Sequence, residues 1–163
     1  MFKKLALAAS LALIASTSAI AATPYYAGVD LGQTKLDGIS GRKTSFGGFA
    51  GYNFNENIAA EFGYRRLASF KYSGVDFDVD QIALSAVGSF PVGEGFSIFG
   101  RLGYNRLNVD GKANGLKASE STSGALIGIG ASYTFAPNIA ARLEFQRPSS
   151  DSNNLSLGVS FGF

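Results

Sequence analysis

A two-residue alternation of apolar residues with polar or small ones is the feature that most constrains this chain. The last stretch shows it clearly, with apolar residues at Leu155, Leu157, Val159, Phe161 and Phe163. Successive side chains of a β-strand point to opposite faces, so this stretch has one apolar face and one polar or small face. The pattern therefore predicts a strand that lies between two different environments.

The same alternation recurs in seven earlier segments, which gives eight predicted strands. These segments cover residues 25–32, 44–54, 57–66, 78–90, 96–106, 124–135 and 138–147. Tight turns are expected at 55–57, 91–95 and 136–138, and longer polar loops at 34–43, 71–74, 110–121 and 148–153. An even number of strands with alternating short turns and longer loops is typical of a bacterial outer-membrane barrel. We therefore predict an all-β fold, an eight-stranded antiparallel up-and-down transmembrane β-barrel.

The face opposite the apolar residues indicates which way the barrel is turned. It carries the charged residues Asp30, Glu61, Arg65, Arg101, Arg142 and Glu144. An eight-stranded barrel is only just wide enough inside for its own side chains, so the many aromatic rings cannot all fit there. We expect the apolar residues to face lipid and the six charges to lie in the lumen, as an ion-pair network or as polar filling. The alternative is a soluble, lipocalin-like ligand carrier with its apolar side inward.

The first 21 residues predict a secretory signal peptide. Lys3 and Lys4 precede a short apolar run and a small-residue exit, so cleavage is expected after Ala21 or Ala22. The apolar run falls short of the ~20 residues that a spanning helix needs, which disfavours an uncleaved anchor. Residues 22–163 then form the barrel domain. The signal contains two lysines and no acid, so the mature domain has twelve basic and twelve acidic residues, which argues against a nucleic-acid partner.

Enzymatic chemistry is not expected. The chain has no histidine and no cysteine, which removes the usual proton shuttle and the commonest transition-metal ligand. The stretch "GVSFG" matches a nucleophile elbow at Ser160, but such an elbow needs a strand-to-helix turn and a histidine. We predict a protein that is not an enzyme and that uses no cofactor.

Two further motifs are judged accidental. Asp76, Asp78 and Asp80 share one face of a strand, but Gln81 and Val87 stand where an EF-hand loop needs Gly and Glu. We expect these three carboxylates to be solvated above the bilayer and no metal to bind. Asn154 begins a glycosylation-like "NLS", but it lies inside a predicted strand and is discounted.

The two ends of the predicted barrel, one at the tight turns and one at the longer loops, carry different residue types. Aromatic residues gather near the predicted turns and suggest a periplasmic girdle formed by Tyr25, Tyr52, Phe54, Phe90, Phe96, Tyr133, Phe135 and Phe163. Cations gather in the predicted external loops at Lys35, Arg42, Lys43, Lys71, Lys112 and Lys117. Lipopolysaccharide phosphates lie at that level, so contact with them is one interpretation and simple solvation is the other.

The opening "YYAGVDLGQTKL", the strand "AARLEFQR" and the ending "GVSFGF" resemble the membrane domain of the OmpA family and its small relatives. The resemblance implies a barrel in the outer membrane of a Gram-negative bacterium, with a charged lumen that limits ion passage. It also implies that Phe161 and Phe163 act as a signal for the barrel-assembly machinery, with periplasmic chaperones as partners during biogenesis. OmpA carries an additional peptidoglycan-binding domain, whose function is not expected here because the sequence stops at Phe163.

The expected function is therefore structural, a contribution to envelope integrity with a filled lumen and at most weak ion conductance. One alternative is an adhesin that contacts a host surface through its external loops, which are short and polar. Another is a narrow porin, although eight strands leave no open water channel. The sequence does not identify an external partner.

Overall fold

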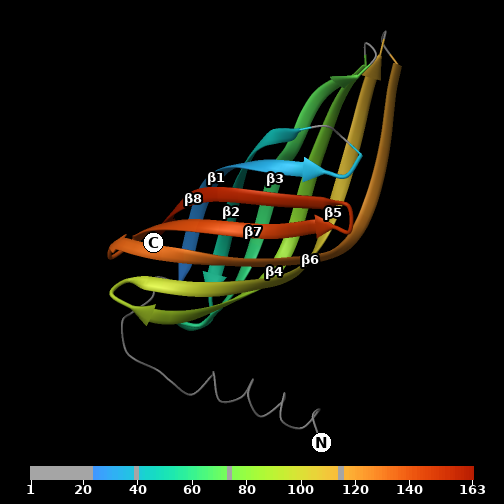
Figure 1. Ribbon diagram of the computed structural model, residues 1–163. Helices are drawn as coiled ribbons and strands as arrows, with labels where there is room; N and C mark the ends of the chain where they lie inside the picture. The colour runs from blue at the N-terminus through green and yellow to red at the C-terminus, as the bar shows by residue number, and fades with distance from the viewer. Residues whose placement is uncertain (1–23, 39–40, 73–74, 114–115) are drawn as a thin grey trace, which may run out of the picture.

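The computed structural model describes residues 24–38, 41–72, 75–113 and 116–163, without the side chains of 70–76 and 112–118. These residues form one closed antiparallel barrel, in which β1 pairs with both β2 and β8 (Figure 1). The strands are β1 (Tyr25–Leu36), β2 (Arg42–Asn53), β3 (Ile58–Tyr72), β4 (Val75–Gly93), β5 (Phe96–Ala113), β6 (Leu116–Ala136), β7 (Ile139–Ser149) and β8 (Ser152–Gly162). The predicted eight-stranded up-and-down barrel is confirmed.

The predicted signal peptide, residues 1–21, lies outside the described residues. Within the described part of the chain, no helix has the length and the apolar character needed to cross a membrane.

The strands run further than predicted at the loop end. The predicted loops at 71–74 and 110–121 are largely strand, because β3 reaches Tyr72, β5 reaches Ala113 and β6 begins at Leu116. The predicted loop at 34–43 is likewise shortened by β1 and β2. Outside the lipid both faces of a strand meet water, so the apolar alternation that marks a strand fades while backbone pairing continues.

The extended ends of β3 to β6 form a sheet that projects beyond the rest of the barrel (Figure 1). We call residues 68–72, 75–80, 107–113 and 116–123 the protruding sheet. At the opposite end, β4 continues to Gly93, and the predicted turn 91–95 narrows to Glu94 and Gly95. Glu94 has a positive φ of 46°, which is unusual for a residue with a side chain.

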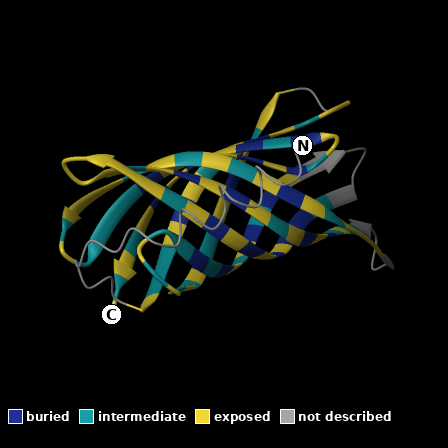
Figure 2. Cartoon of the chain, turned by 90° about the horizontal axis from the view of Figure 1, so that it is seen from below, coloured by how far each residue is buried: buried dark blue, intermediate teal, exposed yellow. Residues whose placement is uncertain are grey.

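The barrel is apolar outside and polar inside. Buried and exposed residues alternate along each strand and produce a checkerboard across the wall (Figure 2). On β1, Leu31 is 67% exposed, whereas its neighbour Asp30 is 4% exposed. The lipocalin-like alternative is therefore wrong, because its apolar side chains would point inward.

The interior is filled by large side chains from some strands and small ones from their neighbours. All six predicted lumen charges come from the odd-numbered strands β1, β3, β5 and β7. The even-numbered strands supply glycines beside them: Gly47 faces Arg65, Gly128 faces Glu144 and Gly158 faces Asp30. A Cβ on Gly128 would come within 2.9 Å of a Glu144 carboxylate oxygen, so these glycines make room for the charged groups.

Candidate functional site in the barrel lumen

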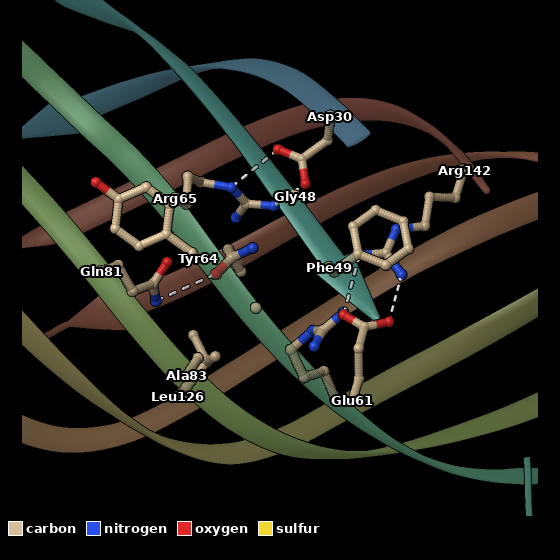
Figure 3. A pocket seen from close by; sticks show the side chains of 13 residues that line it. Asp30, Gly48, Phe49, Glu61, Tyr64, Arg65, Gln81, Ala83, Leu126 and Arg142 are labelled. Carbon is tan, nitrogen blue, oxygen red and sulfur yellow. Dashed lines mark hydrogen bonds and ion pairs between the residues drawn. The ribbon is translucent and has the colours of Figure 1, made fainter. Parts of the chain in front are cut away.

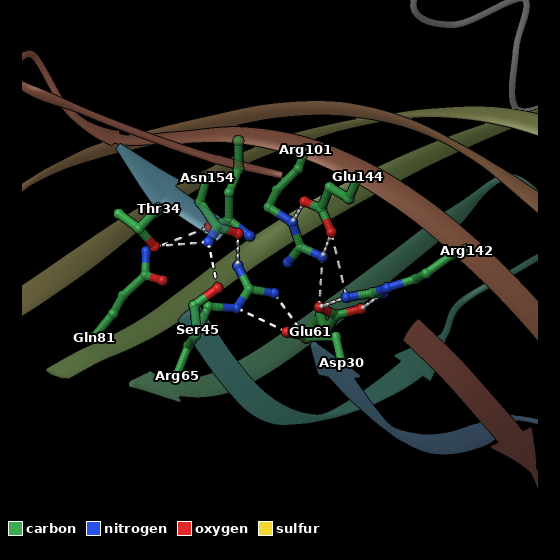
Figure 4. A network of polar contacts seen from close by, with 11 residues as sticks. Asp30, Thr34, Ser45, Glu61, Arg65, Gln81, Arg101, Arg142, Glu144 and Asn154 are labelled. Carbon is green, nitrogen blue, oxygen red and sulfur yellow. Dashed lines mark hydrogen bonds and ion pairs between the residues drawn. The ribbon is translucent and has the colours of Figure 1, made fainter. Parts of the chain in front are cut away.

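The polar contacts in the lumen form two layers, a lower one nearer the turn end and an upper one nearer the loop end. The lower layer is a four-residue cluster of two acids and two arginines from β3, β5 and β7 (Figure 4). Arg101 donates to Glu61 through Nη2 at 2.5 Å and to Glu144 through Nε at 2.5 Å. Arg142 donates to both Glu61 oxygens, at 2.7 and 3.2 Å, and lies 3.3 Å from Glu144. Each carboxylate therefore meets both guanidinium groups across the width of the barrel.

The upper layer links β1, β2, β3 and β8. Arg65 donates to Asp30 in a bidentate pair at 2.9 and 2.7 Å and reaches Asn154 Oδ1 at 3.2 Å. Asn154 in turn donates to Thr34 at 2.9 Å and to Ser45 at 2.7 Å. The side chain that the sequence offered as a glycosylation motif is thus fully buried in the lumen. Figure 4 shows the two layers together.

Little space remains between the two layers. The cavity there has a volume of about 20 Å³ and is lined by residues of both layers, including Asp30, Glu61 and Arg101 (Figure 3). Such a volume accommodates about one water molecule. We call the two layers together the lumen plug.

Apolar side chains lie in the lumen beyond each layer. Above the plug, Leu36 packs against a buried cluster formed by Leu67, Ala68, Val79 and Leu107. Below it, Tyr26 packs against a second cluster of Ala59, Val87 and Phe99. A vestibule of about 370 Å³ opens at the turn end and reaches this cluster and Arg142, with serine, threonine and asparagine side chains among its lining.

Aromatic contacts complete the lower layer and were not identified from the sequence. The Arg142 guanidinium lies 3.5 Å from the centre of the Phe49 ring, which Figure 3 shows beside it. Tyr26 donates a hydrogen bond to Glu61 at 3.0 Å. The cation–π contact between Arg142 and Phe49 stabilises the desolvated guanidinium group. The available signal was that Phe49 falls on the polar face of its strand, where an aromatic ring needs a specific partner.

The plug has no net formal charge, because three carboxylates face three guanidinium groups. The side chains of Glu61 and Glu144 are 1% exposed. Charges removed from water in this way are costly unless they are paired and hydrogen-bonded, and all six are. This arrangement can fill the lumen and oppose the entry of ions of either sign.

The predicted row of aspartates differs from expectation at one position. Asp80 is not solvated, since it accepts two hydrogen bonds from Arg66, at 2.9 and 3.1 Å, on the outer face above the apolar band. Partial burial alone would raise the pKa of Asp80, but hydrogen bonds from Arg66 and Tyr64 hold it below its usual value. Asp78 accepts a hydrogen bond from Ser69, and Asp76 has no described side chain.

Metal and nucleophile chemistry gain no support from the geometry. Among the described residues, no group of three or more His, Cys, Asp or Glu side chains could hold a metal ion. Ser160 lies within β8, and its hydroxyl is 3.4 Å from the Ala140 carbonyl oxygen, to which it donates.

The eight aromatic residues predicted to form a girdle all lie outward or at the turn end. Tyr25 has its ring centre 5.2 Å from that of Tyr52 and 6.4 Å from that of Phe163, while Tyr52 lies 5.2 Å from Phe54. On the neighbouring strands β5 and β6, the ring centres of Phe96 and Tyr133 are 4.5 Å apart. Phe90 and Phe135 are exposed on the same end, as are Phe161 and Phe163.

The predicted loop cations occupy different surroundings. Lys35 and Arg42 lie on β1 and β2, not in a loop, and share the outward face with the apolar residues. Lys43 lies on β2 with the opposite parity, toward the mouth of the lumen. Lys71, Lys112 and Lys117 fall among the side chains outside the described residues.

Comparison with known proteins gives matches along the whole fold. The family model described as "Outer membrane protein beta-barrel domain" matches residues 5–163. Outer membrane protein A of Serratia marcescens is 31% identical over 160 residues, covering 85% of this chain and 43% of the relative. Outer membrane protein A of Yersinia pseudotuberculosis is 30% identical and covers 99% of this chain and 56% of the relative. The chain thus spans about half the length of the curated relatives it matches.

Solved structures share the fold at lower identity. Neisserial surface protein A superposes with a TM-score of 0.73 at 19% identity, covering 87% of this chain and 99% of that protein. Ail, the attachment invasion locus protein of Yersinia pestis, was solved in complex with the heparin analogue sucrose octasulfate. It superposes with a TM-score of 0.61 at 21% identity, covering 85% of this chain and 96% of Ail.

Proposed function

We propose that this chain, which belongs to the outer membrane protein β-barrel family, is a structural outer-membrane barrel. Its lumen is sealed against bulk ion flow. Its relatives are outer membrane proteins of Gram-negative bacteria, and the chain resides in that membrane. The observation that carries the proposal is the lumen plug, with its cavity of only about 20 Å³ between two hydrogen-bonded layers. The contribution to the cell is envelope integrity.

The charge balance in the plug supports a sealed lumen rather than an ion-selective pore. A lumen lined by an excess of one sign attracts counter-ions, as in the charged rings of ion channels. Here the three carboxylates are each paired with arginine, so no unbalanced charge invites a cation or an anion. The narrow-porin alternative therefore has less support than the sealed barrel.

The test is planar-bilayer conductance of the full mature chain and of Arg142→Ala. The native protein is expected to give little or no current. Loss of the Arg142 side chain removes a partner of Glu61 and Glu144 and leaves an excess negative charge in the lumen. The variant should therefore show a larger current with a preference for cations.

Arg147→Ala is the matched control, since Arg147 lies on the same strand with the opposite parity and is exposed. It removes the same charge without touching the plug, so its conductance should equal that of the native protein. Heat-modifiable gel mobility checks that each variant is a folded barrel. Large, steady currents from the native protein, or equal currents from both variants, would contradict the sealed-lumen proposal.

A second candidate is contact with an external surface through the protruding sheet. Strand β6 pairs with β7 only from Ile127 onward. Residues 116–126 pair with β5 on one side, and their other side is an edge with no strand partner among the described residues. Exposed edges accept an additional strand from a partner protein. Ail, a barrel of the same fold, carries a heparin analogue in its crystal structure, which supports surface contact as a use of this architecture.

Bacteria that display the native protein, tested for adhesion to heparin-coated and to extracellular-matrix-coated surfaces, distinguish this candidate. A variant lacking residues 109–120 should lose adhesion while it still inserts into the outer membrane. Equal adhesion of the two strains would remove the candidate.

Biogenesis partners are also part of the proposal. Phe161 and Phe163 are exposed at the turn end of the barrel, and we propose that these aromatic residues are recognised by the barrel-assembly machinery. Replacement of Phe163 with Ser should slow insertion and prolong association with periplasmic chaperones, as measured by pulse-chase fractionation. The same fractionation of Phe161→Ser tests the second position.

A further inference from the structure

The vestibule at the turn end of the barrel is open to water on one side and ends at the lumen plug on the other. It has a volume of about 370 Å³, and Arg142 lines it and also belongs to the plug. The cavity between the two layers of the plug has room for about one water molecule. A larger solute that enters the vestibule therefore stops at the plug. The volume of the vestibule lies within the range of about 300–1,000 Å³ that is typical of small-molecule sites.

Hydroxyl groups line the walls of the vestibule. They come from strands β4, β5, β6 and β8, on the residues Ser89, Ser97, Ser132, Thr134 and Ser160. Ser97 and Ser132 are direct cross-strand partners, and Ser97 shares the inner face of β5 with the buried Phe99. Ser160 donates to the Ala140 carbonyl at 3.4 Å, whereas the other four hydroxyls make no side-chain hydrogen bond within the described part of the chain. Each hydroxyl offers one donor and two acceptor sites, so the walls can bind a ligand that is rich in polar atoms.

The charges that line the vestibule are balanced. Among the described residues of the lining, Arg142 is the one cation, and Glu56, in the turn between β2 and β3, is the one acid. Arg142 is already paired with Glu61 and Glu144 in the plug. A charged solute therefore meets no excess of opposite charge, and it would lose part of its hydration on entry. The lining favours a neutral ligand.

An aromatic surface lies at the inner end of the vestibule. Tyr26 packs over Gly51, its direct partner on β2, where a Cβ would overlap the Tyr26 ring. The Tyr26 hydroxyl donates to Glu61 at 3.0 Å, which fixes the position of the ring. Phe99 contributes to the same end of the lining. The face of an aromatic ring carries partial negative charge, so it attracts the C–H groups of a ligand.

We propose that the vestibule binds a small neutral saccharide. The hydroxyl groups of the sugar hydrogen-bond with wall hydroxyls, among them Ser97 and Ser132, and its C–H face packs against Tyr26 and Phe99. A saccharide meets the conditions that the lining sets, because it is rich in donors and acceptors, carries no charge and has an apolar face. This binding goes beyond the proposed function, since a sealed structural barrel needs no ligand.

The experiment is an NMR titration of the full mature chain, isotope-labelled and folded in lipid nanodiscs, so that no sugar-based detergent competes. The probes are glucose, glucuronate and glucosamine, which share one ring and differ in charge at mildly acidic pH, and glycerol, a polyol without a ring. The backbone amide signals of Ser97, Ser132 and Ser160 report binding. Glucose should shift these signals saturably, with a dissociation constant on the order of 1–10 mM, because the ligand stays partly hydrated in an open site.

The test variant is Ser97→Ala/Ser132→Ala, which removes two wall hydroxyls and no side chain of the lumen plug. Glucose should bind this variant about five- to tenfold more weakly than it binds the native protein, since two hydrogen bonds are lost. The matched control is Ser119→Ala/Ser121→Ala, which removes two hydroxyls of β6 at the loop end. The control should bind glucose as the native protein does.

A variant that fills the vestibule tests the cavity itself. Ala140 on β7 is the direct partner of Thr134 on β6 and of Ser160 on β8, so Ala140→Phe places a ring among the wall hydroxyls. This variant should no longer bind glucose. Heat-modifiable gel mobility checks that each variant is a folded barrel, and if Ala140→Phe does not fold, the double serine variant decides the outcome.

Equal glucose affinity of the native protein and the double serine variant would overturn the proposal, as would shifts that do not saturate or that glycerol reproduces. Tighter binding of glucuronate or glucosamine than of glucose would overturn the assignment to a neutral ligand. These results concern the vestibule alone and leave the bilayer conductance of the native barrel unchanged, so the sealed-lumen proposal would still stand. Large native currents would overturn that seal instead, while the same titration would still decide whether the vestibule binds glucose.

Discussion

At the scale of single residues, the lumen is specified by pairs of a large and a small side chain on adjacent strands. Phe99 on β5 packs against the backbone of Gly130 on β6, its direct cross-strand partner. A Cβ at Gly130 would overlap the Phe99 ring and the Leu143 carbonyl, whereas a Cβ at Gly100 would meet no atom within 4 Å. The two glycines lie close together on opposite faces of the same wall.

Gly130→Ala should therefore destabilise the barrel by about 1–3 kcal/mol, because overpacking a filled interior displaces its neighbours. Gly100→Ala, which faces lipid, should change the free energy of unfolding by about 0.5 kcal/mol or less. Urea unfolding of the two variants in lipid vesicles measures the difference. Equal unfolding midpoints would show that the lumen near Phe99 is looser than the structure indicates.

At the scale of the strands, each wall element has two parts with different solvents. The lower part of β5, from Phe96 to about Arg106, alternates between lipid and lumen, and the upper part enters the protruding sheet. Backbone pairing of β5 with β6 continues from Phe96 to Ala113 without a shift in register. The upper part is thus a hairpin built on a barrel that is already complete beneath it.

Removal of residues 109–120, with a two-residue Asn-Gly turn joining Asn108 to Ser121, should leave a folded barrel. These two residues are direct partners, so a tight turn can connect them, and the lumen plug lies below the cut. Removal of the same length within the lipid-facing part, which would include Arg101, should prevent folding. Heat-modifiable mobility and outer-membrane fractionation of the two deletions check the expectation.

The sequence predicts the faces of these elements better than their ends or their partners. Parity alone put Glu61 and Arg142 on the inner face, where both are buried. Their pairing joins positions 81 residues apart and depends on strand register and tilt, which parity does not determine. The end of β5 was missed because apolar alternation stops near the lipid boundary while the hairpin continues in water. Phe49 lacked an obvious role because its partner, the Arg142 guanidinium, comes from a strand that is not its neighbour.

At the scale of the whole molecule, the barrel depends on the pairing of β1 with β8. The ladder runs from Tyr26 with Gly162 to Leu36 with Ser152 and removes both free edges of the sheet. Because hydrocarbon offers no hydrogen-bond partner, a sheet in lipid must be closed in this way. The ends of the described chain meet again at the turn end, where the backbones of Tyr25 and Phe163 are hydrogen-bonded at 2.9 Å.

A disulfide across this seam tests closure directly, since the chain contains no cysteine. Val29 and Val159 are direct partners on the outer face, and antiparallel partners have Cα atoms about 4.5–5.5 Å apart, within disulfide range. Val29→Cys/Val159→Cys should form an intramolecular disulfide in the folded protein, seen as a redox-sensitive gel shift. Val29→Cys/Ile129→Cys, on distant strands, should form none; a crosslink there, or only dimers from the first pair, would contradict the closed topology.

The strands that supply the lumen charges also constrain how the protein enters the membrane. Apart from the contact between Arg142 and Glu144 within β7, the ion pairs of the plug join strands that are not neighbours, such as β3 with β5 and β1 with β3. Apart from one that contains β7, no single hairpin can pair its own lumen charges, so a partly inserted intermediate would carry bare carboxylates and guanidinium groups into hydrocarbon at a high energetic cost. Insertion should consequently be concerted, with the hairpins crossing the bilayer together and the interior charges meeting only as the last strands arrive.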